Sequence, residues 1–164
     1  MTETQNITDI PKKTDNEPLR VCFVCTGNTC RSPMAMAVLN HLGKGNYIAT
    51  SAGLMADKGS PINEKARNAL INANIISSPE NDYDNHKACQ LDMGIMQSCD
   101  LIVAVGKGHA MMIIQNFPIF ASKVTSFDRN ITDPYGQSQQ VYDDCLCEIT
   151  DCIKRMFALG ENNE

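Results

Sequence analysis

The stretch that decides the fold is VCFVCTGNTCRSP, residues 21–33. Its first four residues form a short apolar run of strand-forming types, which predicts a buried parallel strand. Gly27 and Asn28 then indicate a tight loop. Pro33 suits the first turn of a helix that runs to a stop at Gly43. The sequence therefore predicts a strand, a short loop and a helix in immediate succession.

Strand and helix patterns continue to alternate along the rest of the chain, apart from an ambiguous region between residues 77 and 100. Further strands are expected over residues 47–51, 101–105 and 123–127, and further helices over residues 63–73, 109–116 and 141–159. This alternation predicts an α/β fold: a single doubly wound, mainly parallel four-stranded sheet with helices on both faces. Ligands of such sheets bind beyond the carboxyl ends of the strands, where Cys25 lies.

Length and charge limit the classes of function. The 164 residues fit one domain, with a polar, disordered leader expected over residues 1–18 and the folded domain over residues 19–160. The net charge of -5 disfavours nucleic acid and anionic membranes as partners. The chain shows neither an apolar run of membrane-spanning length nor a signal peptide, so a cytoplasmic protein with reduced cysteines is expected.

Cys25 and Arg31 bracket the loop, with five residues between them. A loop of this length can direct its backbone N–H groups and the positive end of the following helix at one point, which makes a phosphate cradle. We expect these dipoles and the Arg31 guanidinium to favour the Cys25 thiolate, a nucleophile. Arg31 can also hold two phosphate oxygens. Ser32 can hydrogen-bond the sulfur, or it can be a plain helix cap.

The run from Val24 to Pro33 resembles the signature of the low-molecular-weight protein tyrosine phosphatases. The resemblance continues through Ser51-Ala52-Gly53 and through Asp133-Pro134-Tyr135-Gly136. In that family an aspartate directly before a proline is the general acid, so the resemblance assigns this role to Asp133. Protonating the leaving oxygen is chemistry that a carboxylic acid performs well. One departure is Met36, where the family usually carries a glutamate.

The resemblance implies further site residues. It implies a phosphate-binding loop that contains, besides Cys25 and Arg31, the residues Thr26, Gly27, Asn28, Thr29, Cys30 and Ser32. Side chains that support the loop are implied at Ser51 and His86. A substrate-pocket wall is implied at Leu54, Met55 and Tyr135. The segment 54–59 lacks the aromatic residue of eukaryotic members, which resembles bacterial members that act on tyrosine kinases of exopolysaccharide export.

The function predicted from these residues is hydrolysis of phosphotyrosine, and of aryl phosphates, through a phosphocysteine on Cys25. Arg31 binds the phosphate and Asp133 serves as general acid and base. No cofactor or metal is expected. The expected partner is a phosphotyrosine protein, with a bacterial tyrosine kinase as the candidate.

Alternatives remain at this point. A thiol-dependent arsenate reductase would use a similar cysteine loop but needs two further redox cysteines after a strand, where residues 106–109 hold none. A non-catalytic phosphate- or phosphopeptide-binding module would need neither the thiol nor the acid. A reversible Cys25–Cys30 disulfide is a hypothesis beside that of a spectator thiol. The remaining cysteines, Cys89 and Cys99 among them, are interpreted as core or spectator thiols.

Overall fold

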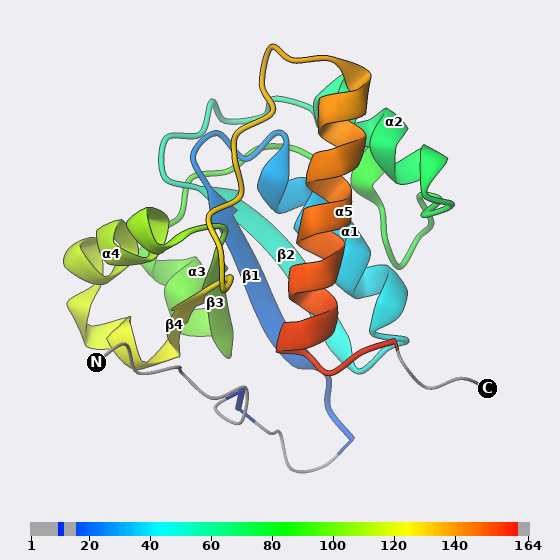
Figure 1. Cartoon of the computed structure of the whole chain (residues 1–164). Coiled ribbons are helices and arrows are strands. Elements are labelled where there is room, and N and C mark those ends of the chain that lie inside the picture. The colour runs from blue at the N-terminus through cyan, green and yellow to red at the C-terminus, as the bar shows by residue number, and fades with distance from the viewer. Residues whose placement is uncertain (1–9, 12–15, 161–164) are drawn as a thin grey trace.

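A sheet of four parallel strands forms the centre of the molecule, in the order β2-β1-β3-β4 (Figure 1). The computed structural model describes residues 10–11 and 16–160. The strands are β1 (Leu19–Cys25), β2 (Tyr47–Gly53), β3 (Leu101–Ala104) and β4 (Val124–Ser126). Because the pairs are parallel, the carboxyl ends of all four strands lie at one end of the sheet. The predicted doubly wound α/β fold is confirmed.

Helices cover both faces of this sheet (Figure 1). One face carries α1 (Arg31–Leu42), α2 (Glu64–Asn72) and α5 (Gln139–Met156), and the other carries α3 (Met93–Ser98), α4 (Lys107–Asn116) and the 3-10 helix η3 (Pro118–Lys123). A second 3-10 helix, η2 (Tyr83–Asn85), lies between α2 and α3. Side chains of β1 alternate between two cores: Val21, Phe23 and Cys25 face α1 and α5, whereas Cys22 and Val24 face α3 and α4.

The region that the sequence left ambiguous contains the shortest α-helix of the described residues, α3. The Asp92 side chain caps its start by accepting a hydrogen bond from the Ile95 N–H over 2.8 Å. The Lys123 ammonium holds its other end by donating to the carbonyls of Met96 and Cys99, at 2.7 and 2.9 Å. A helix of six residues is too short for its periodicity to be read from sequence.

The first strand, β1, begins at Leu19, and the polar leader expected over residues 1–18 stays a prediction. Residues 1–9 and 12–15 of that leader lie outside the described residues. Among the helices that the structure describes, none has both the length and the apolar composition to cross a membrane.

Candidate active site

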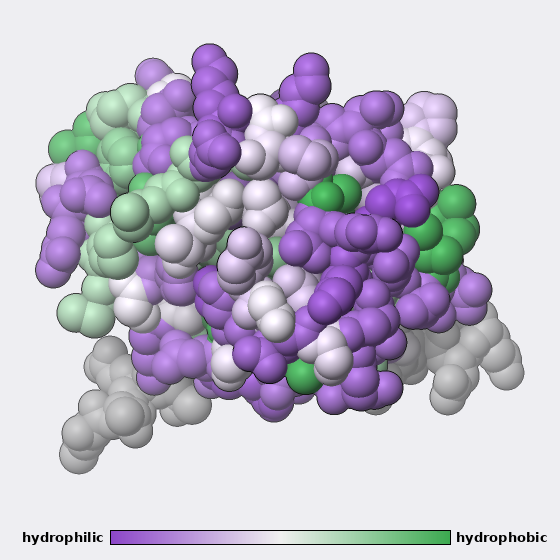
Figure 2. Space-filling view, turned by 90° about the horizontal axis from the view of Figure 1, so that it is seen from above, coloured by the Kyte–Doolittle hydropathy of each residue, from purple (hydrophilic) through white to green (hydrophobic). Residues whose placement is uncertain are grey.

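Cys25 is the last residue of β1, and the loop of residues 26–30 curls around its sulfur. The Asn28 N–H donates a hydrogen bond to Cys25 Sγ over 3.3 Å, and the Ser32 hydroxyl lies 2.9 Å from the same sulfur. The thiol therefore lies between a backbone N–H and a hydroxyl at the carboxyl end of a central strand. Figure 2 looks onto this end of the molecule, whose surface is mostly hydrophilic, with hydrophobic residues on the α4 side and a second group at the opposite edge.

Asn28 holds the loop in its curled shape. It is fully buried and adopts a left-handed backbone conformation with φ of 59°. Its side chain donates to Ser32 Oγ over 2.8 Å and accepts from the Cys89 N–H over 3.0 Å. Left-handed backbone is costly for residues other than glycine, and asparagine tolerates it better than most. These side-chain hydrogen bonds offset that cost and link the loop to the segment before α3.

His86 supports the same residue from outside the loop. Its Nε2 atom lies 2.7 Å from the Asn28 carbonyl oxygen. Burial lowers the pKa of His86, and the hydrogen bond to this carbonyl opposes the shift. The neutral ring with its proton on Nε2 is therefore the form that donates here. The structure thus brings the His86 ring to the backbone of the loop, and its role in supporting the loop stays a prediction.

Arg31 and Asp133 meet at the mouth of the loop. Arg31 begins α1, is 7% exposed, and donates from Nη1 to the Ile131 carbonyl over 3.0 Å. Its Nη2 atom lies 3.6 Å from Asp133 Oδ2, and the Asp133 side chain is 54% exposed. The Tyr135 N–H fixes the carboxylate by donating to Oδ1 over 3.1 Å. The arginine is thus anchored from behind while the carboxylate is open to solvent.

Ser51 does not contribute its hydroxyl to the loop, contrary to the role that the resemblance implied. The hydroxyl instead donates to the Met36 sulfur over 3.7 Å, on the α1 face of β2. The Ser32 hydroxyl has two acceptors within reach of its one proton, the Cys25 sulfur at 2.9 Å and the neighbouring carbonyl of Ala52 at 3.4 Å. The Ser51 side chain points to α1, as the alternation of side chains along a strand allows, and only the backbone of β2 reaches Ser32. Met36 stands where the family usually has a glutamate.

The last residue of β2, Gly53, is a glycine because the loop after Cys25 passes close to it. A Cβ atom at this position would lie 2.6 Å from the Thr26 carbonyl oxygen and 3.1 Å from the Asn28 Cβ. The backbone of β2 therefore approaches the loop more closely than any other residue type permits. The two N–H groups that follow Gly53 bind the loop: the Leu54 N–H donates to the Cys25 carbonyl over 3.0 Å, and the Met55 N–H donates to the Thr26 carbonyl over 2.9 Å.

The residues expected to form the pocket wall lie around the loop's rim. Leu54 is half-buried against the core beside α3, whereas the side chains of Met55 and Tyr135 are exposed, at 74% and 71%. Met55 follows β2, and Tyr135 follows Asp133 on the segment before α5. Two of the three side chains are therefore largely exposed, and their role as a pocket wall stays a prediction.

His109 is a rim residue that sequence reasoning missed. It lies in the first turn of α4, and its Nε2 atom is 2.9 Å from the Thr26 hydroxyl. Burial and then the Arg31 charge lower the pKa of His109, while Asp133 opposes them. The charges of Arg31 and Asp133 therefore both affect the pKa of the His109 ring. The available signal was its place just after β3, because ligands of parallel sheets bind beyond strand carboxyl ends.

The second cysteine of the loop, Cys30, is buried, and its sulfur lies 3.6 Å from the Tyr142 hydroxyl of α5. Burial raises the pKa of Cys30, although hydrogen bonds with Tyr142 and Thr29 oppose the shift. The reversible disulfide with Cys25 stays a hypothesis. Within residues 10–11 and 16–160, no group of three or more His, Cys, Asp or Glu residues is arranged to hold a metal ion.

The comparisons with known proteins agree with this geometry. Residues 20–163 match the family model described as low molecular weight phosphotyrosine protein phosphatase. The chain therefore belongs to the low molecular weight protein tyrosine phosphatases, a family of phosphoprotein hydrolases that work through a cysteine.

Three similar proteins carry three different names. A protein-arginine-phosphatase from Geobacillus stearothermophilus is 33% identical, over 85% of this chain and 94% of its own length. A low molecular weight protein tyrosine phosphatase from T. tengcongensis is similar in structure, with a TM-score of 0.78 and 31% identity, over 85% of this chain and 98% of that one. An arsenate reductase from Bacillus cereus is 30% identical, over 86% of this chain and 96% of its own length.

Proposed function

We propose that this protein hydrolyses phosphotyrosine in proteins, and simple aryl phosphates, with Cys25 as nucleophile, Arg31 as phosphate ligand and Asp133 as general acid and base. The observation that carries the proposal is the arrangement around one sulfur. Cys25 Sγ has hydrogen-bond partners at 2.9 and 3.3 Å, and an anchored guanidinium and an exposed carboxylate stand 3.6 Å apart at the mouth. A backbone N–H, a hydroxyl and a guanidinium beside one thiol suit the binding of a phosphate dianion.

In the first step, the Cys25 thiolate attacks phosphorus while the bond from phosphorus to the tyrosyl oxygen breaks. The Asp133 carboxylic acid gives its proton to that oxygen, so the leaving group departs as neutral tyrosine. The planar guanidinium of Arg31 can bind two of the equatorial oxygens as their charge redistributes. The product of this step is a phosphocysteine.

In the second step, the ionised Asp133 takes a proton from a water molecule, whose oxygen attacks phosphorus. The bond between sulfur and phosphorus breaks, and its electron pair returns to Cys25. The 2.9 Å distance from Ser32 Oγ to the sulfur supports a role for Ser32 in donating a hydrogen bond to the departing thiolate. Inorganic phosphate leaves, and the original charge states of Cys25 and Asp133 are restored.

The test is hydrolysis of p-nitrophenyl phosphate and of a phosphotyrosine peptide by the reduced protein across pH 5 to 7.5. Cys25→Ser is expected to abolish turnover while the loop still binds phosphate. Asp133→Asn is expected to lower kcat by about 10²-fold or more for the tyrosyl leaving group, and less for nitrophenol, which leaves without help. Full activity of Cys25→Ser would overturn the proposal, and equal losses for both leaving groups would remove Asp133 from the acid role.

A phosphoarginine substrate is the second candidate. Two observations favour it. The first is the similarity to the Geobacillus arginine phosphatase. The second is that the Met55 and Tyr135 side chains are both largely exposed, so they do not enclose the substrate by stacking on an aromatic ring. The same two steps apply, with a bond from phosphorus to nitrogen breaking and Asp133 protonating the guanidine. Peptides of one sequence carrying either phosphotyrosine or phosphoarginine decide the matter through their kcat/KM values.

Arsenate reduction is less well supported than either. Its thiol relay needs two further cysteines that can reach Cys25 in turn. Cys89 and Cys99 pack in the core beside α3, on the sheet face opposite Cys25. The Cys89 thiol is engaged with the Ser51 carbonyl at 3.4 Å. Thioredoxin-coupled arsenate turnover would establish this activity, and its absence beside phosphatase activity would dismiss it.

A phosphotyrosine protein is the class of partner that the family supports. A tyrosine kinase of exopolysaccharide export, and a cytoplasmic location, stay predictions. Trapping with Cys25→Ser, followed by phosphotyrosine analysis of the bound proteins, tests the kinase. Recovery of phosphoproteins without phosphotyrosine would contradict it.

A further inference from the structure

The first turn of α2 lies between the phosphate loop and the segment that precedes α5. Asn63, the residue before the helix, donates its backbone N–H to the Thr29 carbonyl of the loop over 2.9 Å. The Lys65 ammonium donates to the Gln137 carbonyl over 2.6 Å. In the opposite direction, the Gln139 side chain donates to the Lys65 carbonyl over 2.9 Å. One helix start thus binds two segments of the active site.

Helix α2 is itself anchored in the core. Its Ala66, Ala69 and Leu70 side chains are buried in the core that it shares with α5, beside which it lies (Figure 1). The Asn63 side chain caps the helix by accepting from the Lys65 N–H over 2.9 Å. Because both its N–H and its carbonyl have partners, the backbone of Lys65 is a fixed point from which the long side chain reaches out.

The segment that carries Asp133 is fixed at its front end by the phosphate ligand. Ile131 donates its N–H to the Val105 carbonyl over 3.1 Å, and its own carbonyl accepts from Arg31 Nη1 over 3.0 Å. The Asp133 carboxylate follows two residues later and accepts from the Tyr135 N–H over 3.1 Å. This last bond fixes the carboxylate relative to its own turn, so the place of the carboxylate depends on where that turn lies.

The rear end of the same turn is bound by Lys65. The Gln137 N–H closes the turn by donating to the Pro134 carbonyl over 3.0 Å, with Gly136 in a left-handed conformation at φ of 78°. The Gln137 carbonyl accepts from the Lys65 ammonium, and a hydrogen bond from a charged donor is stronger than one between neutral groups. Loss of the ammonium removes the contact that joins the turn itself to α2, whereas the Gln139 contact lies beyond the turn.

We propose that Lys65 is a positioning residue for the general acid. It sets the place of the Asp133 carboxylate by holding the Gln137 carbonyl, and the same helix start is held against the phosphate loop by Asn63. The inference rests on the acid role proposed above for Asp133. Proton transfer to the leaving oxygen requires an acid within about 3 Å of it, so a small shift of the turn slows that transfer. Phosphate binding depends on the loop and Arg31, and it should not change.

The first test compares leaving groups in full-length Lys65→Met, whose side chain keeps its length and loses the ammonium. We expect kcat/KM for a phosphotyrosine peptide to fall about tenfold, because a misplaced acid loses part of its effect. With p-nitrophenyl phosphate, whose leaving group needs less help, kcat/KM should fall at most about twofold. The inhibition constant of vanadate should stay at the wild-type value. Lys65→Arg, which keeps a charged donor, should restore the peptide rate.

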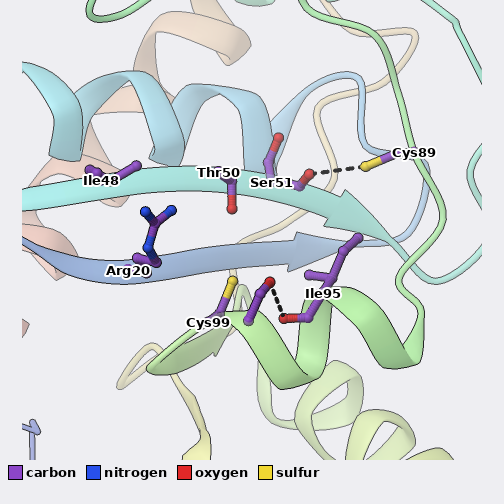
Figure 3. Close-up of a pocket in the computed structure, with 8 residues that line it drawn as sticks. Arg20, Ile48, Thr50, Ser51, Cys89, Ile95 and Cys99 are labelled. Atoms are coloured by element: carbon purple, nitrogen blue, oxygen red, sulfur yellow. Dashed lines mark hydrogen bonds between the residues drawn. The ribbon is translucent and has the colours of Figure 1, made fainter.

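A double variant shows whether Lys65 acts through Asp133. In the Asp133→Asn background the acid is already lost, so adding Lys65→Met should lower kcat/KM for the peptide by less than about twofold. Equal losses in both backgrounds would overturn the proposal. The matched control is Arg20→Met. It also removes one exposed positive charge, from the groove of about 280 Å³ on the sheet face opposite Cys25 (Figure 3), and both substrates should keep their wild-type rates.

Hydrogen exchange gives a readout that does not depend on turnover. In Lys65→Met, the amides of residues 132–138 should exchange faster than in the wild type, because the turn has lost its contact with α2. The amides of residues 25–33, in the phosphate loop, should exchange at the wild-type rate. Unchanged exchange in the turn would contradict the positioning role.

The outcomes separate this inference from the proposed function. If Asp133→Asn slows both leaving groups equally, Asp133 is not the acid, and both proposals fail. If Asp133→Asn behaves as expected while Lys65→Met keeps the wild-type kcat/KM for the peptide, only the positioning role of Lys65 fails. Loss of vanadate binding in Lys65→Met would show that the phosphate loop itself has changed, and this result would also refute the positioning role.

Discussion

Replacement of Asn28 measures how much free energy holds the phosphate loop in shape. Asn28→Ala removes the hydrogen bonds to Ser32 and from the Cys89 N–H, at 2.8 and 3.0 Å, and leaves a buried N–H unpaired. Two such bonds contribute about 2 kcal/mol together. An alanine at φ of 59° adds about 1 kcal/mol of strain. The free energy of unfolding should therefore fall by about 3 kcal/mol.

Asn28→Gly separates the two terms, because glycine adopts the left-handed conformation without strain. It should lose only the hydrogen-bond part, about 2 kcal/mol. Urea unfolding followed by circular dichroism gives both values, since the chain has no tryptophan. Both variants should lower kcat by about 10²-fold, because the N–H that faces Cys25 Sγ is no longer fixed. The reasoning fails if the free energies of unfolding of both variants lie within about 0.5 kcal/mol of the wild-type value, which is the usual spread of surface substitutions.

Other substitutions test the remaining contacts of the loop. Gly53→Ala forces a Cβ to within 2.6 Å of the Thr26 carbonyl and should weaken vanadate binding about tenfold, whereas a Cβ at Gly108 meets nothing within 4 Å, so Gly108→Ala should bind normally. Because the pKa of His86 is lowered in the folded protein, its contribution to stability is complete above the unfolded-state pKa of about 6.5 and is lost as pH falls toward the folded-state pKa. His86→Gln should therefore flatten the dependence of Tm on pH between pH 5 and 7.5. Parallel Tm curves for the variant and the wild type would contradict this. His109→Phe should raise KM about fivefold by removing one hydrogen bond, and an unchanged KM would exclude His109 from the rim.

The sequence was sufficient where chemistry and local structure depend on the same residues. The strand, loop and helix around Cys25 follow from hydrophobic pattern, glycine and proline, and the structure has them at those positions. His86 was found only through the family resemblance, since its hydrogen bond to Asn28 spans 58 residues of chain. No local pattern reports a contact of that range, because the turn that brings the two segments together depends on the whole fold.

The misses have a common physical cause. Ser51 was expected at the loop, but the alternation of strand residues directs its hydroxyl to Met36 while the adjacent carbonyl reaches Ser32. The sequence predicted only a helix over residues 109–116, yet the sheet order places β3 beside β1 and so brings His109, in the first turn of α4, to Thr26.

Helix α1 begins at Arg31 without a side-chain cap on its first N–H groups, although α2 and α5 are both capped by their own asparagine and serine. The unpaired donors of an α-helix start are normally satisfied by such a side chain. In this chain they lie at the end of α1 that follows the Cys25 loop, so we expect an oxyanion bound in the loop to accept hydrogen bonds from them. Binding of the oxyanion and the stability of the first turn of α1 are then thermodynamically coupled. Phosphate, the product, should accordingly protect the amides of α1 from hydrogen exchange and act as a stabiliser of the protein that releases it.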